Sequence, residues 1–368
     1  MAGLIVHEWL EKAGGAENVV DAVAQLFPEA PIACLWNDAP LRYDAGRVKE
    51  SALARGPFRG RKALALPTMP VVWNSFSSEP DPDWVFVSSH LFAHHADFGT
   101  RRRGVPKFVY VHTPARYIWV PELDKRGGSL AVRSAASLLR PVDRRAAQRN
   151  QNVAANSEYV RARIAQSWNM DARVLYPPVE TTEISAVEVW RTQLVHEDEV
   201  LLETLPSDFI LGASRFVSYK DLDLVIAAGQ AIDVPVVICG AGPQEAELRA
   251  VASAASVPVH FVISPSTALL RHLFQTAVAY IFPPVEDFGI MPVEAMAAGA
   301  RVLVNHVGGA SESVEDGISG VHIDPNDTTQ LADAIDRAAR LQKTNIRTRA
   351  SCFGRETFER SLLDWMEL

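Results

Sequence analysis

Backbone N–H groups that could hold an anion occur in one segment of the C-terminal half, Glu286–Gly299, which reads EDFGIMPVEAMAAG. It follows an apolar, strand-like run, and Pro292 stands where a first helical position is expected. The segment therefore predicts a loop and then a helix, with the backbone N–H groups of Gly289, Ile290 and Met291 at the helix entrance. Because the first N–H groups of a helix have no acceptor within it, this entrance favours phosphate or another anion.

Two carboxylates bracket this helix entrance. Glu286 lies in the loop, and Glu294 lies in the first turn of the expected helix. A carboxylate beside a phosphate accepts hydrogen bonds from sugar hydroxyls instead of binding the anion, so the pair indicates a nucleotide-sugar ligand. Glu294 by itself is also the kind of residue that complements a helix dipole, which is the alternative interpretation.

Two cations follow another predicted strand. Arg215 and Lys220 come after the run 209–213 and precede a helical pattern. Open α/β sheets bind their ligands at the carboxyl ends of the strands, where two cations can neutralise a departing diphosphate. A solvated pair of loop charges is the alternative for these two residues.

Further strand ends carry glycines and a histidine. Gly14 and Gly15 follow the first strand, Gly242 lies in a Gly-Ala-Gly-Pro turn, and His112 ends an apolar strand. Glycine allows the backbone to approach a ligand closely, and it is equally compatible with a simple turn. His112 is compatible with ligand contact or with support of its turn.

A sheet must position these residues, and 368 residues are enough for two domains. Short apolar runs alternate with amphipathic helical patterns, which predicts parallel sheets covered by helices on both faces. The alternation pauses at 176–178, a Tyr-Pro-Pro sequence, and resumes at Phe209, so we expect the domain junction there. The predicted fold class is α/β, with two Rossmann-like, doubly wound domains facing a cleft and strands at 4–7, 32–35, 84–88, 107–112, 152–156, 209–213, 236–239, 259–262, 278–282 and 301–305.

Composition and charge exclude several classes of protein. The chain is 48% apolar and 22% charged, which argues against disorder, and its three distant cysteines argue against a disulfide framework or a zinc site. The first 178 residues carry a net charge of +6 and the remainder −14, as expected for two domains with different partners. The basic residues are too scattered for nucleic-acid binding. Without a basic leader or a membrane-spanning run, a cytoplasmic location is expected.

Two Asp-x-Asp pairs match a pattern that can hold a divalent cation, Asp221 with Asp223 and Asp81 with Asp83. One pair starts a predicted helix, and the other precedes a predicted strand instead of ending one. We interpret both pairs as capping or loop acids and expect no metal and no other cofactor.

The combination of motifs resembles glycosyltransferase family 4, retaining transferases of the GT-B fold that use nucleotide sugars. The main match is Glu286, seven residues and Glu294; Arg215 with Lys220 and the Gly-Gly-Ala-Glu sequence at 14–17 reinforce it. The His-Thr-Pro-Ala-Arg-Tyr sequence at 112–117 is similar to the branch that includes mannosyl- and rhamnosyltransferases of bacterial polysaccharide biosynthesis.

The resemblance implies an N-terminal acceptor-binding domain at 1–178, completed by a C-terminal helix at 355–368, and a nucleotide-sugar-binding domain at 179–354. It implies metal-independent transfer of a hexose, with mannose from GDP-mannose favoured, to a hydroxyl of a glycan or lipid-linked saccharide. A non-catalytic sugar-nucleotide or glycan-binding partner of an active transferase is the alternative function.

Roles for individual residues also follow from the resemblance. Glu286 would hold hydroxyls of the transferred sugar and Glu294 the nucleotide ribose, while Arg215 and Lys220 would stabilise the diphosphate together with the N–H groups at 289–291. In the N-terminal domain, Gly14 and Gly15 would line the cleft, and His112 would contact the donor sugar.

The nucleobase would lie near Gly242 and Ile263. Relatives usually have a glycine-containing turn after the corresponding strand, whereas this chain has Ile263-Ser264-Pro265-Ser266. The identity of the base therefore stays open at this stage.

Two groups of arginines in the first half lead us to expect peripheral association with the anionic inner face of a membrane, where basic residues are attracted. A solvated protein surface is the alternative for either group. The residues are Arg101, Arg102 and Arg103 in one group and Arg140, Arg144, Arg145 and Arg149 in the other.

Overall fold

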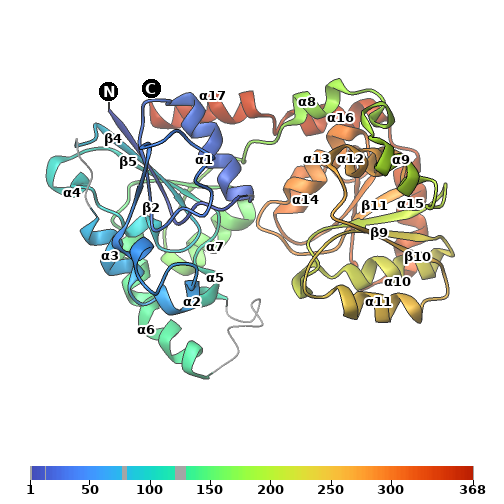
Figure 1. Cartoon of the computed structure of the whole chain (residues 1–368), viewed down its shortest axis with the longest axis horizontal. Coiled ribbons are helices and arrows are strands. Elements are labelled where there is room, and N and C mark those ends of the chain that lie inside the picture. The colour runs from blue at the N-terminus through green and yellow to red at the C-terminus, as the bar shows by residue number, and fades with distance from the viewer. Residues whose placement is uncertain (1, 13, 77–80, 121–129, 368) are drawn as a thin grey trace. The chain divides into compact units, whose positions relative to one another are not determined.

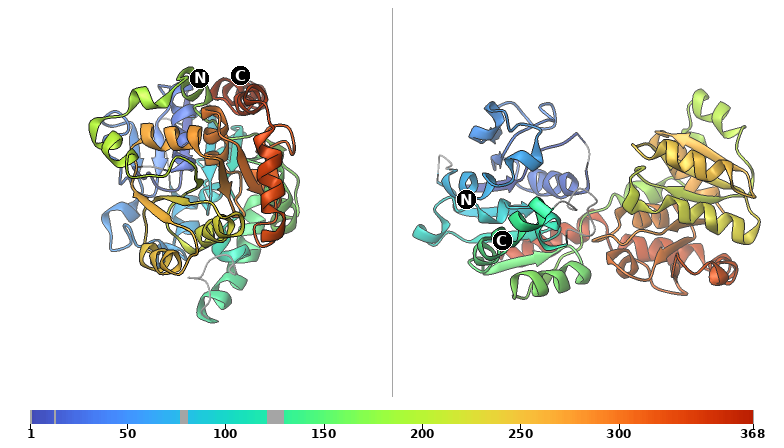
Figure 2. Two further views of the ribbon diagram at one scale, coloured as in Figure 1. Left: turned by 90° about the vertical axis from the view of Figure 1, so that its right-hand side faces the viewer. Right: turned by 90° about the horizontal axis from the view of Figure 1, so that it is seen from below.

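A computed structural model describes residues 2–12, 14–76, 81–120 and 130–367. The chain forms two compact units: unit 1 comprises Met1–Pro178 and Phe358–Leu368, and unit 2 comprises Val179–Thr357. Each unit is built on one sheet with helices on its faces (Figures 1 and 2). In the described part of the chain, no helix is both long and apolar enough to cross a lipid bilayer.

Unit 1 contains a seven-stranded parallel sheet in the order β3-β2-β1-β4-β5-β6-β7. Parallel pairing brings the carboxyl ends of the strands to one edge, where His7 of the first strand lies beside Ser88 of the fourth. The strands are β1 (Gly3–His7), β2 (Ile32–Cys34), β3 (Val48–Glu50), β4 (Trp84–Ser89), β5 (Lys107–Val111), β6 (Asn152–Ala155) and β7 (Arg173–Val174).

Alternate residues along these strands enter two separate cores, one on each face of the sheet. Val6 packs in a cluster with Trp73 and Trp168, while Ile5 packs in the other cluster with Phe358. Burial on both faces explains the near-continuous apolar runs in the sequence. The helices of this unit are α1 (Gly15–Leu26), α2 (Lys62–Ala65), α3 (Met69–Ser75), α4 (Thr100–Arg103), α5 (Arg116–Trp119), α6 (Leu130–Ala147), α7 (Glu158–Trp168) and, at the end of the chain, α17 (Arg355–Met366).

Unit 2 contains a six-stranded parallel sheet in the order β10-β9-β8-β11-β12-β13. Its strands are β8 (Ile210–Ala213), β9 (Val236–Gly240), β10 (Val259–Ile263), β11 (Ala279–Phe282), β12 (Val302–Asn305) and β13 (Val321–Ile323). Strand residues such as Ile238 and Leu303 pack with Val225 and Leu331 of two covering helices. The helices are α8 (Thr181–Ala186), α9 (His196–Leu202), α10 (Leu222–Ile232), α11 (Glu245–Ser253), α12 (Thr267–Thr276), α13 (Ile290–Ala298), α14 (Gly309–Ser313), α15 (Leu331–Ala339) and α16 (Lys343–Ser351).

The strand order reverses once in each sheet, between β1 and β4 in unit 1 and between β8 and β11 in unit 2. Open α/β sheets bind ligands outside the carboxyl ends of the strands at this reversal. The residues that follow these four strands are therefore the first candidates for a functional site.

All ten predicted strands are present, with their ends displaced by no more than one residue. One expectation was wrong: Pro292 is the third residue of α13, because the helix already begins at Ile290. The boundary between the two units falls after Pro178, within the region expected to be the junction, and the acidic stretch that follows forms α8 and α9 of unit 2.

Candidate functional site

An ion pair lies at the strand reversal of unit 2. Lys220 ends a short 3₁₀ helix, Ser218–Lys220, that follows β8, and its ammonium group donates to a carboxylate oxygen of Glu286 in the loop after β11. The two side chains are only 11% and 18% exposed. The structure thus brings together two residues that are 66 positions apart in the sequence, at the predicted edge of the sheet.

Aromatic groups surround this pair. The Lys220 ammonium lies 5.5 Å from the centre of the Phe282 ring and 5.3 Å from that of Tyr219. The exposed Arg215 donates from Nη2 to the Tyr219 hydroxyl at 2.8 Å. Tyr219 therefore links the two predicted cations, a role that its place between them in the sequence did not reveal.

The entrance of α13 has the form that the sequence predicts. Gly289 precedes the helix with φ of 90°, and a β-carbon there would lie 2.9 Å from the β-carbon of Ala310. Only glycine fits this left-handed position without strain. Gly289 at the N-cap has no side chain that could accept from the first N–H groups of the helix, which include those of Ile290 and Met291, so these groups suit a ligand.

Glu294 lies one turn into α13. Burial raises the pKa of its carboxyl group, Arg271 opposes that shift, and Glu180 adds to it. Within the described residues, Glu294 makes no hydrogen bond or ion pair. Its carboxylate is therefore open to a hydroxyl donor.

The glycine turn after β9 holds the Arg215 loop in place. A β-carbon on Gly242 would lie 2.5 Å from the carbonyl oxygen of Phe216, and the Phe216 N–H donates to the Ala241 carbonyl at 2.9 Å. Close packing is thus a sufficient reason for the glycine. The predicted role of Gly242 in donor binding remains a prediction.

Ile263 ends β10 beside Gly240 of β9, and 41% of its surface is exposed. The next residue, Ser264, has φ of 49°, in the left-handed region that favours glycine. The turn that lacks the family's glycine therefore keeps a glycine-like backbone conformation.

At the strand reversal of unit 1, a serine hydroxyl joins two histidines. Ser88 Oγ lies 2.8 Å from His112 Nε2 and 3.0 Å from His7 Nδ1. Burial, with the nearby His7, lowers the pKa of His112 to about 3, and burial also lowers the pKa of His90 beside it. The Ser88 hydroxyl has only one proton. If Ser88 donates it to His112, Ser88 must accept a hydrogen bond from His7; if Ser88 donates it to His7, it must accept one from His112. The proton on His112 is therefore coupled to that on His7.

Glu17 connects this network to the glycines before α1. Its carboxylate lies 3.9 Å from His7 Nε2 and accepts from the Glu11 N–H at 3.1 Å. Burial alone would raise the pKa of Glu17, but His7 and backbone N–H groups hold it below its usual value. A β-carbon on Gly14 would lie 2.1 Å from the same carboxylate, whereas Gly15 is exposed at the start of the helix.

Sequence reasoning missed His7, Ser88 and Glu17 as members of this site. The available signal was their position, because His7 and Ser88 lie at the carboxyl ends of two adjacent strands at the reversal. Their role depends on side chains meeting across β1, β4 and β5, which no single motif contains.

We expect unit 1 to lose stability in mild acid. His95 has a pKa lowered to about 4 and His112 to about 3, both chiefly through burial, whereas an unfolded histidine titrates near ~6.5. Below that value the unfolded chain takes up protons that the folded unit excludes, so stability falls as the pH drops from ~6.5 toward ~4.

Melting temperatures at pH 7.5 and pH 5 measure this effect, and the lower value should be at pH 5. The exposed His196 in unit 2 provides the control, since His196→Gln should leave the pH dependence unchanged. Equal melting temperatures at the two pH values would contradict the buried neutral state of these histidines.

Neither Asp-x-Asp pair forms a group of three ligands within the described residues. Asp221 occupies the N-cap position of α10 without a capping hydrogen bond from its side chain. Asp81 pairs with Arg103 at 2.8 Å, and Asp83 accepts from the Ala2 N–H at 2.6 Å. Another group, His94, His95 and Asp143, brings three possible ligand atoms within 4.8 Å of one another.

Hydrogen bonds account for Asp143 and His95 in that group, whereas His94 Nε2, 3.1 Å from Asp143 Oδ1, has no hydrogen-bond partner among the described residues. His95 Nε2 lies 3.2 Å from Asp143 Oδ1 with a hydrogen-bond geometry, and the indole N–H groups of Trp119 and Trp168 donate to Asp143 Oδ2 at 2.7 and 2.8 Å. Asp143 therefore anchors α6 to its neighbours.

Several of the arginines expected to face a membrane have partners within unit 1. Arg140 donates to the Ile118 carbonyl and Arg144 to the Ser167 carbonyl, both at 2.8 Å. Both guanidinium groups also lie over the ring of Trp119. These two arginines contribute to packing as well as to surface charge.

The two doubly wound parallel sheets place the protein among glycosyltransferases of the GT-B fold. HepE of Anabaena, solved in complex with UDP, matches with a TM-score of 0.74 and 18% identity over 100% of both chains. Sucrose-phosphate synthase of Thermosynechococcus elongatus matches with a TM-score of 0.73 and 17% identity over 100% of this chain and 98% of that one.

Family comparisons agree with the fold. Glycosyltransferase Family 4 matches residues 13–183, and Glycosyl transferases group 1 matches residues 197–356. The chain therefore combines a Glycosyltransferase Family 4 domain with a Glycosyl transferases group 1 domain.

Two curated relatives are mannosyltransferases by name. O-antigen chain mannosyltransferase C of Escherichia coli is 34% identical over 151 residues, 39% of this chain and 40% of the relative. The GDP-mannose-dependent alpha-(1-6)-phosphatidylinositol monomannoside mannosyltransferase of Mycobacterium tuberculosis is 28% identical over 196 residues, 49% of this chain and 50% of the relative. The chain thus spans half or less of the length of these relatives.

Proposed function

We propose that the protein transfers a hexose from a nucleotide diphosphate sugar to a hydroxyl of a glycan or lipid-linked saccharide, with retention and without a metal. The observation that carries the proposal is the Lys220–Glu286 pair beside the entrance of α13. It combines a cation, uncapped N–H groups and a carboxylate at the strand reversal, which suits an anionic leaving group joined to a sugar.

The ion pair holds the side chains of Lys220 and Glu286 beside the position proposed for the nucleotide-sugar donor. On donor binding, Lys220 exchanges its contact with Glu286 for the diphosphate, and Glu286 accepts hydrogen bonds from sugar hydroxyls. Arg215, held by Tyr219, supplies a second positive charge. Glu294, half-buried and without a hydrogen-bond or ion-pair partner among the described residues, accepts a hydrogen bond from the ribose.

In the reaction, the bond between the anomeric carbon and the diphosphate oxygen breaks, and the acceptor oxygen forms the new bond. Lys220, Arg215 and the entrance of α13 stabilise the charge that grows on the diphosphate. The acceptor proton passes to a diphosphate oxygen on the same face of the sugar, which gives retention. A covalent intermediate on Glu286 is less suitable, because that carboxylate already serves the hydroxyls.

GDP-mannose is the favoured donor, since both relatives are mannosyltransferases by name and one of them is named as GDP-mannose-dependent. The fold neighbour HepE binds UDP, and Ile263 offers an exposed apolar surface that suits any base. In unit 1, Gly14, Gly15 and His112 are proposed to serve the sugar and the acceptor. The proposed setting is the cytoplasm, at the inner face of the membrane when the acceptor is lipid-linked.

Thermal shifts with GDP-, UDP-, dTDP- and ADP-sugars, measured without metal, test the donor. Proton NMR of the product with the preferred donor then tests retention through the anomeric configuration. Donor binding without transfer or hydrolysis, across a panel of glycan acceptors, would favour a non-catalytic sugar-nucleotide-binding partner instead.

We also expect a chelator to leave turnover largely intact. The reason is that Lys220, Arg215 and the helix entrance supply the positive charge that a divalent cation would otherwise provide. Initial rates with EDTA and with added magnesium or manganese measure this. Loss of activity with EDTA and its recovery with either ion would assign a metal role to Asp221 and Asp223 or to Asp81 and Asp83.

A further inference from the structure

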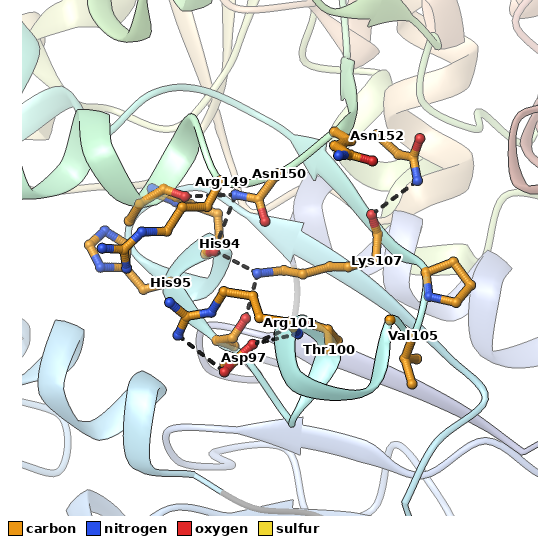
Figure 3. A pocket seen from close by; sticks show the side chains of 15 residues that line it. His94, His95, Asp97, Thr100, Arg101, Val105, Lys107, Arg149, Asn150 and Asn152 are labelled. Atoms are coloured by element: carbon orange, nitrogen blue, oxygen red, sulfur yellow. Dashed lines mark hydrogen bonds and ion pairs between the residues drawn. The ribbon is translucent and has the colours of Figure 1, made fainter.

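A pocket of about 390 Å³ opens in unit 1 where β5 and β6 begin (Figure 3). Its floor contains the buried residues His94, His95 and Asn150, and its rim contains the exposed Arg101 and Arg149. A buried floor with a basic rim is the form of a binding site for a small anionic group.

This pocket lies at the sheet edge opposite to the candidate site. Lys107, which lines it, is the first residue of β5, whereas His112 follows the last. Five residues of extended strand separate the two by about 16 Å. The pocket is therefore independent of the proposed sugar transfer.

Lys107 is a cation without a carboxylate partner. Its ammonium group donates to the carbonyl oxygens of His94, at 2.8 Å, and of Ala96. Within the described residues, no acid lies within ion-pair distance of it. Burial lowers the pKa of Lys107 to about 7; Asp97 opposes that shift, and Arg101 adds to it. Because a charge held in this site only by carbonyl groups is costly, an anion in the pocket would stabilise the protonated form of Lys107.

The acids near the pocket are already engaged. Asp97 Oδ2 accepts from Arg101 Nη2 at 3.1 Å, and Asp97 Oδ1 accepts from the Thr100 hydroxyl at 3.0 Å. Behind the floor, Asp143 accepts from indole and imidazole N–H groups. The side chain of Arg149, by contrast, makes no hydrogen bond or ion pair with the described residues.

We propose that this pocket binds a phosphate group. The third N–H of Lys107 and the planar guanidinium of Arg149 would hold the phosphate oxygens, a geometry in which arginine can donate twice. The volume exceeds that of a phosphate alone, so a small organic group attached to it also fits. The phosphate could belong to a soluble molecule or to a lipid headgroup.

Calorimetric titration of the full chain with inorganic phosphate at low ionic strength tests the proposal. Lys107→Met and Arg149→Gln should each weaken binding by about tenfold or more, as expected for a lost charged hydrogen bond. Arg145→Gln is the matched control, since Arg145 is exposed near the same end of α6 but does not line the pocket. It should change affinity by less than about twofold, as expected for a screened surface charge.

Unit 2 contains a second proposed phosphate site, so the titration is repeated in Lys220→Ala. In the Lys220→Ala variant, the phosphate binding that depends on Lys107 should persist. Because Lys107→Met could disturb folding, the surface variant Arg149→Gln keeps the test independent of stability. Failure of the wild-type protein to bind phosphate, or unchanged binding in both pocket variants, would overturn the proposal.

Co-sedimentation with vesicles distinguishes the two sources. Binding to phosphatidylcholine vesicles containing phosphatidic acid, but not to phosphatidylcholine alone, would assign a lipid headgroup if Arg149→Gln abolishes it and Arg145→Gln does not. Pocket-dependent binding of phosphate without vesicle binding would assign a soluble phosphate compound.

Discussion

Replacing Lys220 with alanine is expected to lower turnover by ~100-fold or more, because loss of one preorganised charge contact in such a site costs ~3–4 kcal/mol of barrier. The ammonium group is nearly buried, it contacts Glu286, and it stands beside the entrance of α13, where its charge is held in place before the donor binds. Arg215→Ala should have an effect of similar size. Steady-state rates of the purified variants with a saturating donor measure both effects.

Arg249 provides the matched control for these two substitutions. It is an exposed arginine of unit 2 that pairs with Glu245 on α11, and Arg249→Ala should retain turnover. Melting temperatures close to the wild-type value would show that the loss in Lys220→Ala is chemical. Wild-type turnover in both Lys220→Ala and Arg215→Ala would remove these residues from the mechanism.

The largest loss of stability is expected from Asp143→Ala, about 3–5 kcal/mol, the usual cost of breaking a buried charged network. The Asp143 carboxylate is fully buried and accepts N–H groups from Trp119, Trp168 and His95, which would all lose their acceptor. Burial alone would raise the pKa of Asp143, but the adjacent histidines hold it well below its usual range. Urea unfolding followed by tryptophan fluorescence measures the change, because two of the donors are indoles.

Asp171→Ala is the comparison for this effect. Asp171 is also an acid of unit 1, but it forms an exposed pair with Arg161, so its removal should leave the urea midpoint close to the wild-type value. A similar small loss in Asp143→Ala would show that the buried carboxylate is not an anchor of α6.

Sequence patterns were sufficient for the strands that carry the core. Runs such as 84–88 and 278–282 are apolar on both faces, which only a parallel sheet covered on both sides explains. Three edge strands, β3, β7 and β13, were missed because they combine a length of two or three residues with polar positions, whereas the equally short β2 is entirely apolar. The helix after Gly289 was recognisable because its glycine, its proline and Gly299 lie close together in the sequence.

Interactions between distant segments could not be predicted in the same way. The Ser88 hydroxyl meets His7 and His112 only because β4 lies between β1 and β5 in the sheet. Likewise, Lys220 and Glu286 were each recognised by type and position, but their contact depends on the loops after β8 and β11 meeting at the strand reversal. Sequence motifs were enough to identify the side chains of the site, whereas the contacts between those side chains could be identified only from the three-dimensional fold.

The last helix of the chain has a consequence for how the protein is made. Phe358, Leu362 and Met366 of α17 belong to the same core as β1, β4 and α1, although all of unit 2 lies between them in the sequence (Figure 1). A ribosome therefore releases nearly all of unit 1 long before the residues that complete its core. During synthesis, unit 2 can fold as soon as it emerges, whereas unit 1 must wait with an exposed apolar face. The nascent chain should accordingly need protection by a chaperone over that face until α17 has emerged.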